Sequence, residues 1–230
     1  MNKVQHGFVA LSLLISSFGT QAQVETDSLL SASNDSTHVK FQNYFYEALK
    51  QKALENYSKA IDALVLCKSL HPTESVVYHE LGTNYFKLKQ FENSEYNFQK
   101  AIALDEGNFW YKESLYHLYT EQNRFEDAIL ALKPLLSQHP DYKQDLVNLY
   151  LEVGRYDDAL DILDDLDKTL GIKASRDKIR NQLYDLSGDE NKRINHLKKR
   201  LEETPKDPTH FLNLIYAYSN LNQKIEAFET

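Results

Sequence analysis

The sequence predicts an all-α fold, a solenoid of antiparallel helix pairs that follow one another along the chain. The 230 residues are 42% hydrophobic but include only 7 Gly and 5 Pro, so the chain can bury a core and has few helix breakers. A short pattern, an aromatic residue three positions before a small one, recurs about every 34 residues. Such a period is typical of helix–turn–helix repeats, which stack to bury a continuous core.

The recurring pattern lies where we expect the second helix of each pair to begin. Its small residues are 34 positions apart in the first three units, and the step to the fourth is shortened to 31. They are Ala60, Ser94, Ala128 and Ala159. Arg193 and Ala227 then resume the 34-residue spacing. Proline stands near the end of three units, at residues 72, 140 and 205, where it stops the helix and sets the next turn.

These residues resemble the tetratricopeptide repeat, a helix–turn–helix unit with small residues at fixed positions and a proline near its end. The resemblance implies a right-handed superhelix of about five and a half repeats in residues 41–230. The units would be 41–74, 75–108, 109–139, 140–173, 174–207 and 208–230, the last one incomplete. Arg193 and Arg200 in unit five, and Tyr116 and Leu135 in unit three, stand at usually small positions. We therefore expect looser packing in these two units.

Helix packing supports the same division of the chain. Small residues let two antiparallel helices approach closely, and aromatic and Leu side chains at i, i+3 and i+4 fill the seam between them. One pair cannot bury its apolar face alone, so at least three must stack. The expected helices cover residues 41–54, 57–70, 75–88, 91–104, 109–121, 125–137, 142–153, 156–169, 174–187, 190–203 and 209–221.

The first 22 residues differ from the rest and predict a secretory signal peptide. Lys3 precedes a short apolar run from Phe8 to Phe18, and Ala22 ends a cleavage site with small residues. A bilayer span needs about 20 apolar residues, more than this run has; the alternatives are an uncleaved anchor or a buried helix. The signal resembles those of exported Bacteroidetes proteins, so we expect a bacterial protein of the periplasm or cell envelope. Residues 23–40 are rich in Ser, Thr, Asp and Asn and predict a flexible linker.

The chain stops at Thr230, a few residues into the second helix expected for unit six. A solenoid normally ends in a capping helix with a polar outer face. We therefore expect a longer protein. One hypothesis that follows is a membrane-bound regulator, with this chain as its exported sensory half and its transmembrane and signalling domains beyond residue 230.

Nothing in the sequence indicates an enzyme, a cofactor or a metal site. It has no nucleophile elbow, Gly-rich phosphate loop or HExxH motif, and its eight His are scattered. A net charge of −8 without a basic block is not that of a general nucleic-acid binder. The acidic stretch from Asp157 to Asp167 has helical apolar spacing, so we expect a solvated helix face there. The lone Cys67 falls at a small position and is expected to be buried.

The resemblance implies that partners bind on a concave surface lined by the first helix of each unit. Aromatic, apolar and polar side chains mix there, which suits an extended peptide or a partner helix. For Trp110, the only Trp, the alternative is core packing between units two and three. The candidate contact residues are Phe45, Leu49, His79, Phe86, Trp110, Glu113, His117, Asn148, Gln182 and Tyr216, with Val76, Thr83, Leu151 and Leu212 beside them. The sequence thus predicts a non-catalytic scaffold for protein–protein interaction.

Overall fold

A computed structural model describes residues 36–206 and 208–221. The expected signal peptide, most of the linker and the last nine residues lie outside the described residues. The chain forms two compact units, Met1–Tyr111 and Lys112–Thr230, and each is considered by itself. Every regular element in the described ranges is helical, which confirms the predicted all-α fold class.

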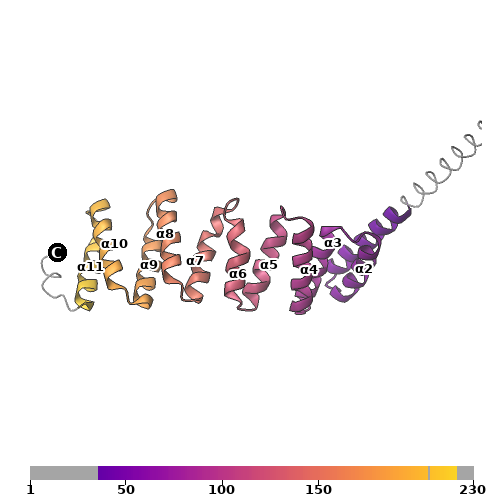
Figure 1. The fold of residues 1–230 in the computed structure, drawn as a ribbon, viewed down its shortest axis with the longest axis horizontal. Helices are drawn as coiled ribbons and strands as arrows, with labels where there is room; N and C mark the ends of the chain where they lie inside the picture. The colour runs from indigo at the N-terminus through magenta and orange to yellow at the C-terminus, as the bar shows by residue number, and fades with distance from the viewer. Residues whose placement is uncertain (1–35, 207, 222–230) are drawn as a thin grey trace, which may run out of the picture. The chain divides into compact units, whose positions relative to one another are not determined.

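The first unit consists of helices that pack in chain order (Figure 1). A helix covers residues 36–53, and it is followed by α2 (Tyr57–Leu70), α3 (Ser75–Lys87), α4 (Phe91–Leu104) and the start of α5 (Phe109–Glu121). Residues 36–40, which were expected in the linker, are already helical. These residues include no Gly or Pro, so nothing prevents the first helix from beginning before residue 41. The core of this unit contains Ala48, Ala63, Leu64, Cys67, Val77 and Leu81.

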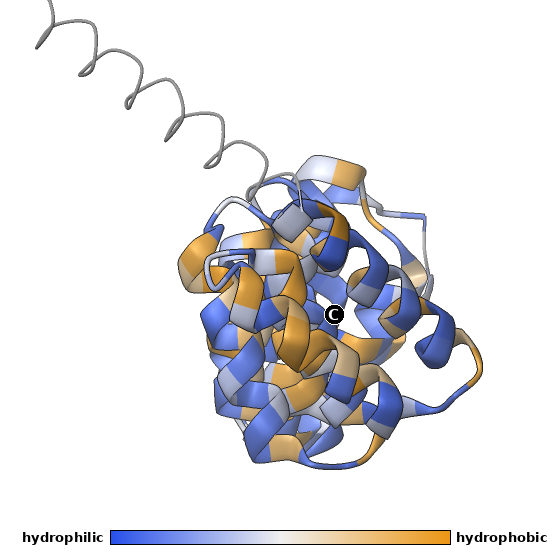
Figure 2. Ribbon diagram, turned by 90° about the vertical axis from the view of Figure 1, so that its right-hand side faces the viewer, coloured by the Kyte–Doolittle hydropathy of each residue, from blue (hydrophilic) through white to orange (hydrophobic). Residues whose placement is uncertain are grey.

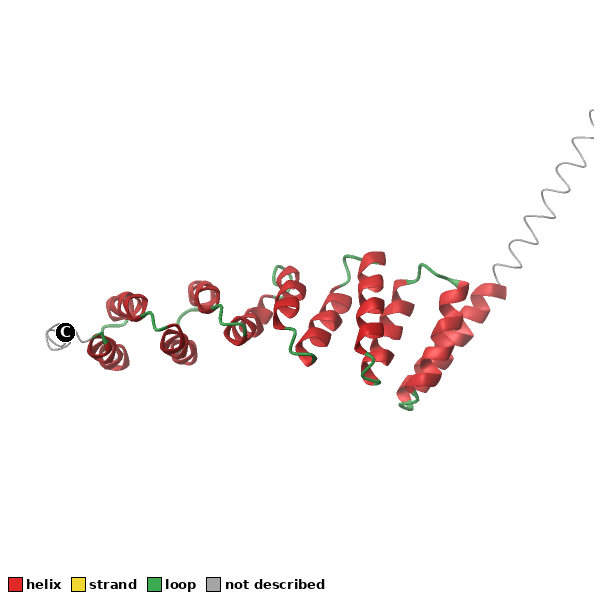
Figure 3. Cartoon of the chain, turned by 60° about the horizontal axis from the view of Figure 1, so that its bottom comes forward, coloured by secondary structure: helices red, strands yellow, loops and turns green. Residues whose placement is uncertain are grey.

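The second unit continues the pattern. Its elements are the rest of α5, α6 (Phe125–Leu132), two 3₁₀ turns (Lys133–Leu135 and Pro140–Tyr142), α7 (Lys143–Glu152), α8 (Tyr156–Leu170), α9 (Ala174–Ser187), α10 (Glu190–Glu203) and α11 (Pro208–Asn220). Where these helices are seen nearly end-on, from α7 to α11, they alternate between two rows (Figure 3). Along the helices, hydrophilic and hydrophobic stretches alternate, as one buried face requires (Figure 2).

Helix α6 ends earlier than the expected range of 125–137. It stops at Leu132 and tightens into a 3₁₀ turn that contains Pro134. Proline has no N–H to donate to a carbonyl four residues back, and its ring crowds that carbonyl. The shortened step in the repeat spacing therefore coincides with a shortened second helix in unit three.

A residue in the left-handed region ends the first helix of each complete pair. Residues 55, 89, 123, 154 and 188 have φ between 56° and 72°, at steps of 34, 34, 31 and 34 residues. In the first four turns the next residue donates its N–H to the carbonyl five positions back, as Gln90 does to Tyr85 at 2.9 Å. This bond satisfies a carbonyl of the helix's last turn. The spacing read from the sequence is thus the spacing of the turns.

Small side chains let the paired helices approach. Ala60, Ala128 and Ala159 are fully buried, and Cys67 is buried as expected. A side-chain Cβ on Gly82 would lie 2.5 Å from Cδ1 of Phe98, so only glycine fits where α3 meets α4. Burial raises the pKa of the Cys67 thiol to about 11.

Candidate functional site

The first unit exposes some of the candidate contact residues and buries others in part. Leu49 on the 36–53 helix and Trp110 at the start of α5 are exposed, whereas Phe45, His79 and Phe86 are half-buried. Trp110 is 65% exposed, which contradicts the alternative that it packs in the core. An indole this exposed is available to a partner.

His79 belongs to an aromatic cluster inside the first unit. Its ring centroid lies 4.8 Å from that of Tyr111 and 5.6 Å from that of Phe98. Burial lowers the pKa of His79, so the imidazole is neutral at pH 7. We therefore interpret His79 mainly as a support for α5 and its neighbours. Phe45 also supports the packing of its unit, since its ring stacks on Phe41 and packs against the core.

In the second unit the candidates on α5 and α7 lie in an acidic environment. The Tyr142 hydroxyl donates to Oε1 of Glu113, and Nε2 of His117 lies 4.0 Å from the same oxygen. Burial and the charge of Asp141 raise the pKa of Asp145, while His117 opposes them. This part of the unit therefore favours a cationic or neutral partner over an anionic one.

The remaining candidates of the second unit are also at the surface. Asn148 on α7, Gln182 on α9 and Tyr216 on α11 are exposed. The guanidinium carbon of Arg193 lies 5.8 Å from the centroid of the Tyr216 ring, a cation–π contact that helps to hold the ring in place. These side chains can contact a partner.

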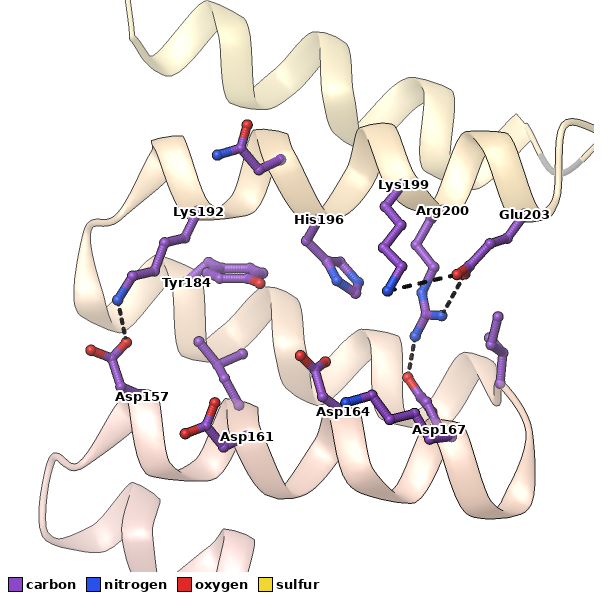
Figure 4. A pocket seen from close by; sticks show the side chains of 14 residues that line it. Asp157, Asp161, Asp164, Asp167, Tyr184, Lys192, His196, Lys199, Arg200 and Glu203 are labelled. Carbon is purple, nitrogen blue, oxygen red and sulfur yellow. Dashed lines mark hydrogen bonds and ion pairs between the residues drawn. The ribbon is translucent and has the colours of Figure 1, made fainter.

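A hollow that the sequence did not predict lies between α8 and α10 (Figure 4). It has a volume of about 690 Å³. Acidic side chains of α8 form one wall, lysines of α10 form the other, and Tyr184 of α9 lies between them. The Lys192 ammonium reaches across to Asp157 at 2.7 Å. The walls thus have opposite charge.

A buried cluster of arginines and carboxylates, centred on Asp167, lies at one end of this hollow. Nε of Arg176 donates to Asp167 at 2.6 Å and Nη2 of Arg180 at 2.9 Å, and Arg200 binds the same carboxylate. The Asp167 side chain is only 8% exposed. The prediction of a solvated acidic face is therefore wrong for Asp167, because the arginines of α9 and α10 face it.

The charge state of Asp167 follows from these contacts. Burial alone would raise the pKa of its carboxyl group, but hydrogen bonds from Arg176 and Arg200 outweigh burial and lower it. Asp167 is therefore ionised at neutral pH. The cluster holds its shape because each buried charge has a counter-charge in contact.

Arg193 and Arg200 stand where the other second helices have small residues, yet both are buried, at 2% and 5% exposure. Arg193 binds Glu190, Asp185 and the carbonyl of Asn181. The looser packing expected for unit five is thus replaced by ion pairs. The available sequence signal was the set of Arg residues at 176, 180, 193 and 200 opposite the acidic α8.

None of the His, Cys, Asp and Glu side chains of the described residues gather in a group of three or more that could hold a metal ion. None of the described helices combines the length and apolar character of a membrane span.

No protein-family profile matches the chain, and no curated protein does so significantly. Solved structures do match. A tetratricopeptide-repeat protein from Parabacteroides merdae is 15% identical, with a TM-score of 0.55 over 83% of this chain and 77% of that one. The chain has the tetratricopeptide-repeat fold.

Two further structures have the same fold. YrrB, a tetratricopeptide-repeat protein with an unusual peptide-binding site, is 14% identical, with a TM-score of 0.53 over 76% of this chain and 90% of YrrB. A chain of the Naa15/Naa10 assembly bound to HypK is 17% identical, with a TM-score of 0.63 over 81% of this chain. This chain spans only 30% of the length of that relative.

Proposed function

We propose that this chain is a non-catalytic scaffold that binds a peptide or helix of a partner protein on the exposed faces of its first helices. The observation that carries the proposal is Trp110, a large aromatic side chain that is 65% exposed on the first turn of α5. Trp is among the residues that contribute most to protein interfaces. YrrB, which has the same fold, has a peptide-binding site, and this supports the proposal.

The test is a selection of binders from a phage-displayed random peptide library, followed by affinity measurements. Trp110→Ala is expected to lower the affinity for the selected peptides by about 30-fold or more, because loss of an aromatic side chain at the centre of an interface has an effect of this size. The matched control is Tyr96→Ala, because Tyr96 is an exposed aromatic of the same unit on a second helix, α4. Equal affinities for the wild type and Trp110→Ala would refute the site.

We also propose that the protein is exported to the periplasm or cell envelope, on the basis of the apolar run after Lys3 and the small residues before Gln23. N-terminal sequencing of the protein from a periplasmic fraction should find a chain that begins at Gln23 or Val24. Recovery of the chain from the cytoplasm with Met1 in place would contradict export.

A further inference from the structure

The arginine–carboxylate cluster is incomplete around Asp177 on α9. Oδ1 of Asp177 forms an ion pair with Nη2 of Arg200 at 3.4 Å, but it lies 3.9 Å from Nε2 of His196 and 4.0 Å from Nε of Arg180. The last two distances are too long for a hydrogen bond. Within the described residues, Oδ1 of Asp177 and Nε of Arg180 are buried and have no hydrogen-bond partner. Buried polar atoms are rarely left in this state, because each has lost its hydration.

The same atoms border a small cavity. About 10 Å³ is open there, between side chains of α9, α10 and α11. This is roughly the room that one water molecule needs. The cavity offers a donor in Arg180, an acceptor in Asp177 and a ring nitrogen in His196. Its lining residues are Asp177, Arg180, Asn181, His196, Leu197 and His210.

We propose that one buried water molecule bridges Asp177, Arg180 and His196 in this cavity, and that this bridge makes the packing of α9 against α10 depend on a neutral His196. The water accepts the N–H of Arg180 and donates to Oδ1 of Asp177 and to the unprotonated nitrogen of His196. A protonated His196 has no lone pair left to accept that bond. Acid then removes one of the contacts that join α9 to α10.

The charges around His196 favour its neutral form. The side chain is 14% exposed, and burial lowers its pKa; Asp177 opposes this effect, while Arg180 and Arg200 add to it. A proton on the ring would add charge to a cluster that already holds several guanidinium groups. The groups that face His196 are Asp164 on α8, Asp177, Arg180 and Tyr184 on α9, Lys199 and Arg200 on α10, and His210 on α11.

The direction of the pH effect follows from proton linkage. The ordinary pKa of His is 6.5, and the folded value for His196 is lower. The unfolded segment therefore binds more protons as the pH falls below about 6.5. For one histidine, the equilibrium constant for folding drops by at most about tenfold between pH 7.5 and 5.5.

Hydrogen exchange measured by mass spectrometry on the full chain tests the switch. After correction for the intrinsic exchange rate, protection of the α9 and α10 amides should fall between pH 7.5 and 5.5. Because Gln cannot be protonated, His196→Gln should lose the part of this fall that comes from His196, which is at most about tenfold. His117→Gln is the matched control, because His117 is an exposed histidine of the same unit. Because the readout is the change with pH, a lower baseline stability of His196→Gln does not affect it.

Two results would overturn the proposal. One is the same loss of protection in His196→Gln as in the wild type. The other is a high-resolution crystal structure at pH 7.5 in which Asp177 and Arg180 pair directly and no water lies within hydrogen-bond distance of both. A water bonded to both atoms, with a pH effect that depends on His196, would support it.

Discussion

Asp167 should be one of the most sensitive charged residues of the second unit. Asp167→Asn keeps the size of the side chain and removes its charge, so Arg176, Arg180 and Arg200 lose their shared counter-charge. Removal of one partner from a buried ion pair costs about 3–5 kcal/mol. We expect a cost of about 3 kcal/mol, because Asp177 stays within 3.4 Å of Arg200.

A thermal melt followed by circular dichroism measures this effect. A loss of ~3 kcal/mol corresponds to a decrease in Tm of about 6–12 °C for a chain of this size. The control is Asp161→Asn, which removes the same charge from an exposed position of α8 and should change Tm by about 1–2 °C at most. If the two variants had the same Tm, the conclusion that the buried ion pairs stabilise the packing of α8 against α9 and α10 would be wrong.

Three further predictions concern packing, turns and the thiol. Gly82→Ala should lower the free energy of unfolding by about 1 kcal/mol or more, because its Cβ would lie 2.5 Å from the Phe98 ring; urea denaturation that shows no loss would contradict this. Lys89→Gly should raise it by about 0.5–1 kcal/mol, since Lys89 has a φ of 57°, whereas Lys87→Gly, at the last residue of α3, should lower it by up to about 1 kcal/mol. Cys67, whose pKa is raised to about 11, should react with a thiol reagent at pH 8 only after unfolding, and rapid labelling of the folded chain would show that the thiol is accessible.

Local patterns in the sequence were sufficient to predict the helices. The expected ranges agree with the structure to within about two residues for most elements, because periodic apolar residues and turn signals act over short distances. The shortened step between units three and four was visible in the spacing of Ala128 and Ala159, and it reappears in the left-handed residues 123 and 154. Pro134 could have corrected the end of α6, since proline interrupts a helix wherever it falls in the interior.

The environment of individual side chains could not be obtained in this way. Asp161 and Asp167 lie on the same acidic helix, yet one is exposed and the other is buried against three arginines. Trp110 could equally have packed in the core. Burial and pairing depend on which side chains of neighbouring helices meet, and no local pattern contains that information.

The sequence by itself determined the helical class, the repeat length and the turn positions, because each depends on residues close together in the chain. Only the tertiary structure decided that Arg200 of α10 shares Asp167 of α8 with the arginines of α9. The physical reason is that a charged side chain is stable in a protein interior only where an opposite charge from another element is in contact with it. Which side chains come into contact is determined by how the helices pack.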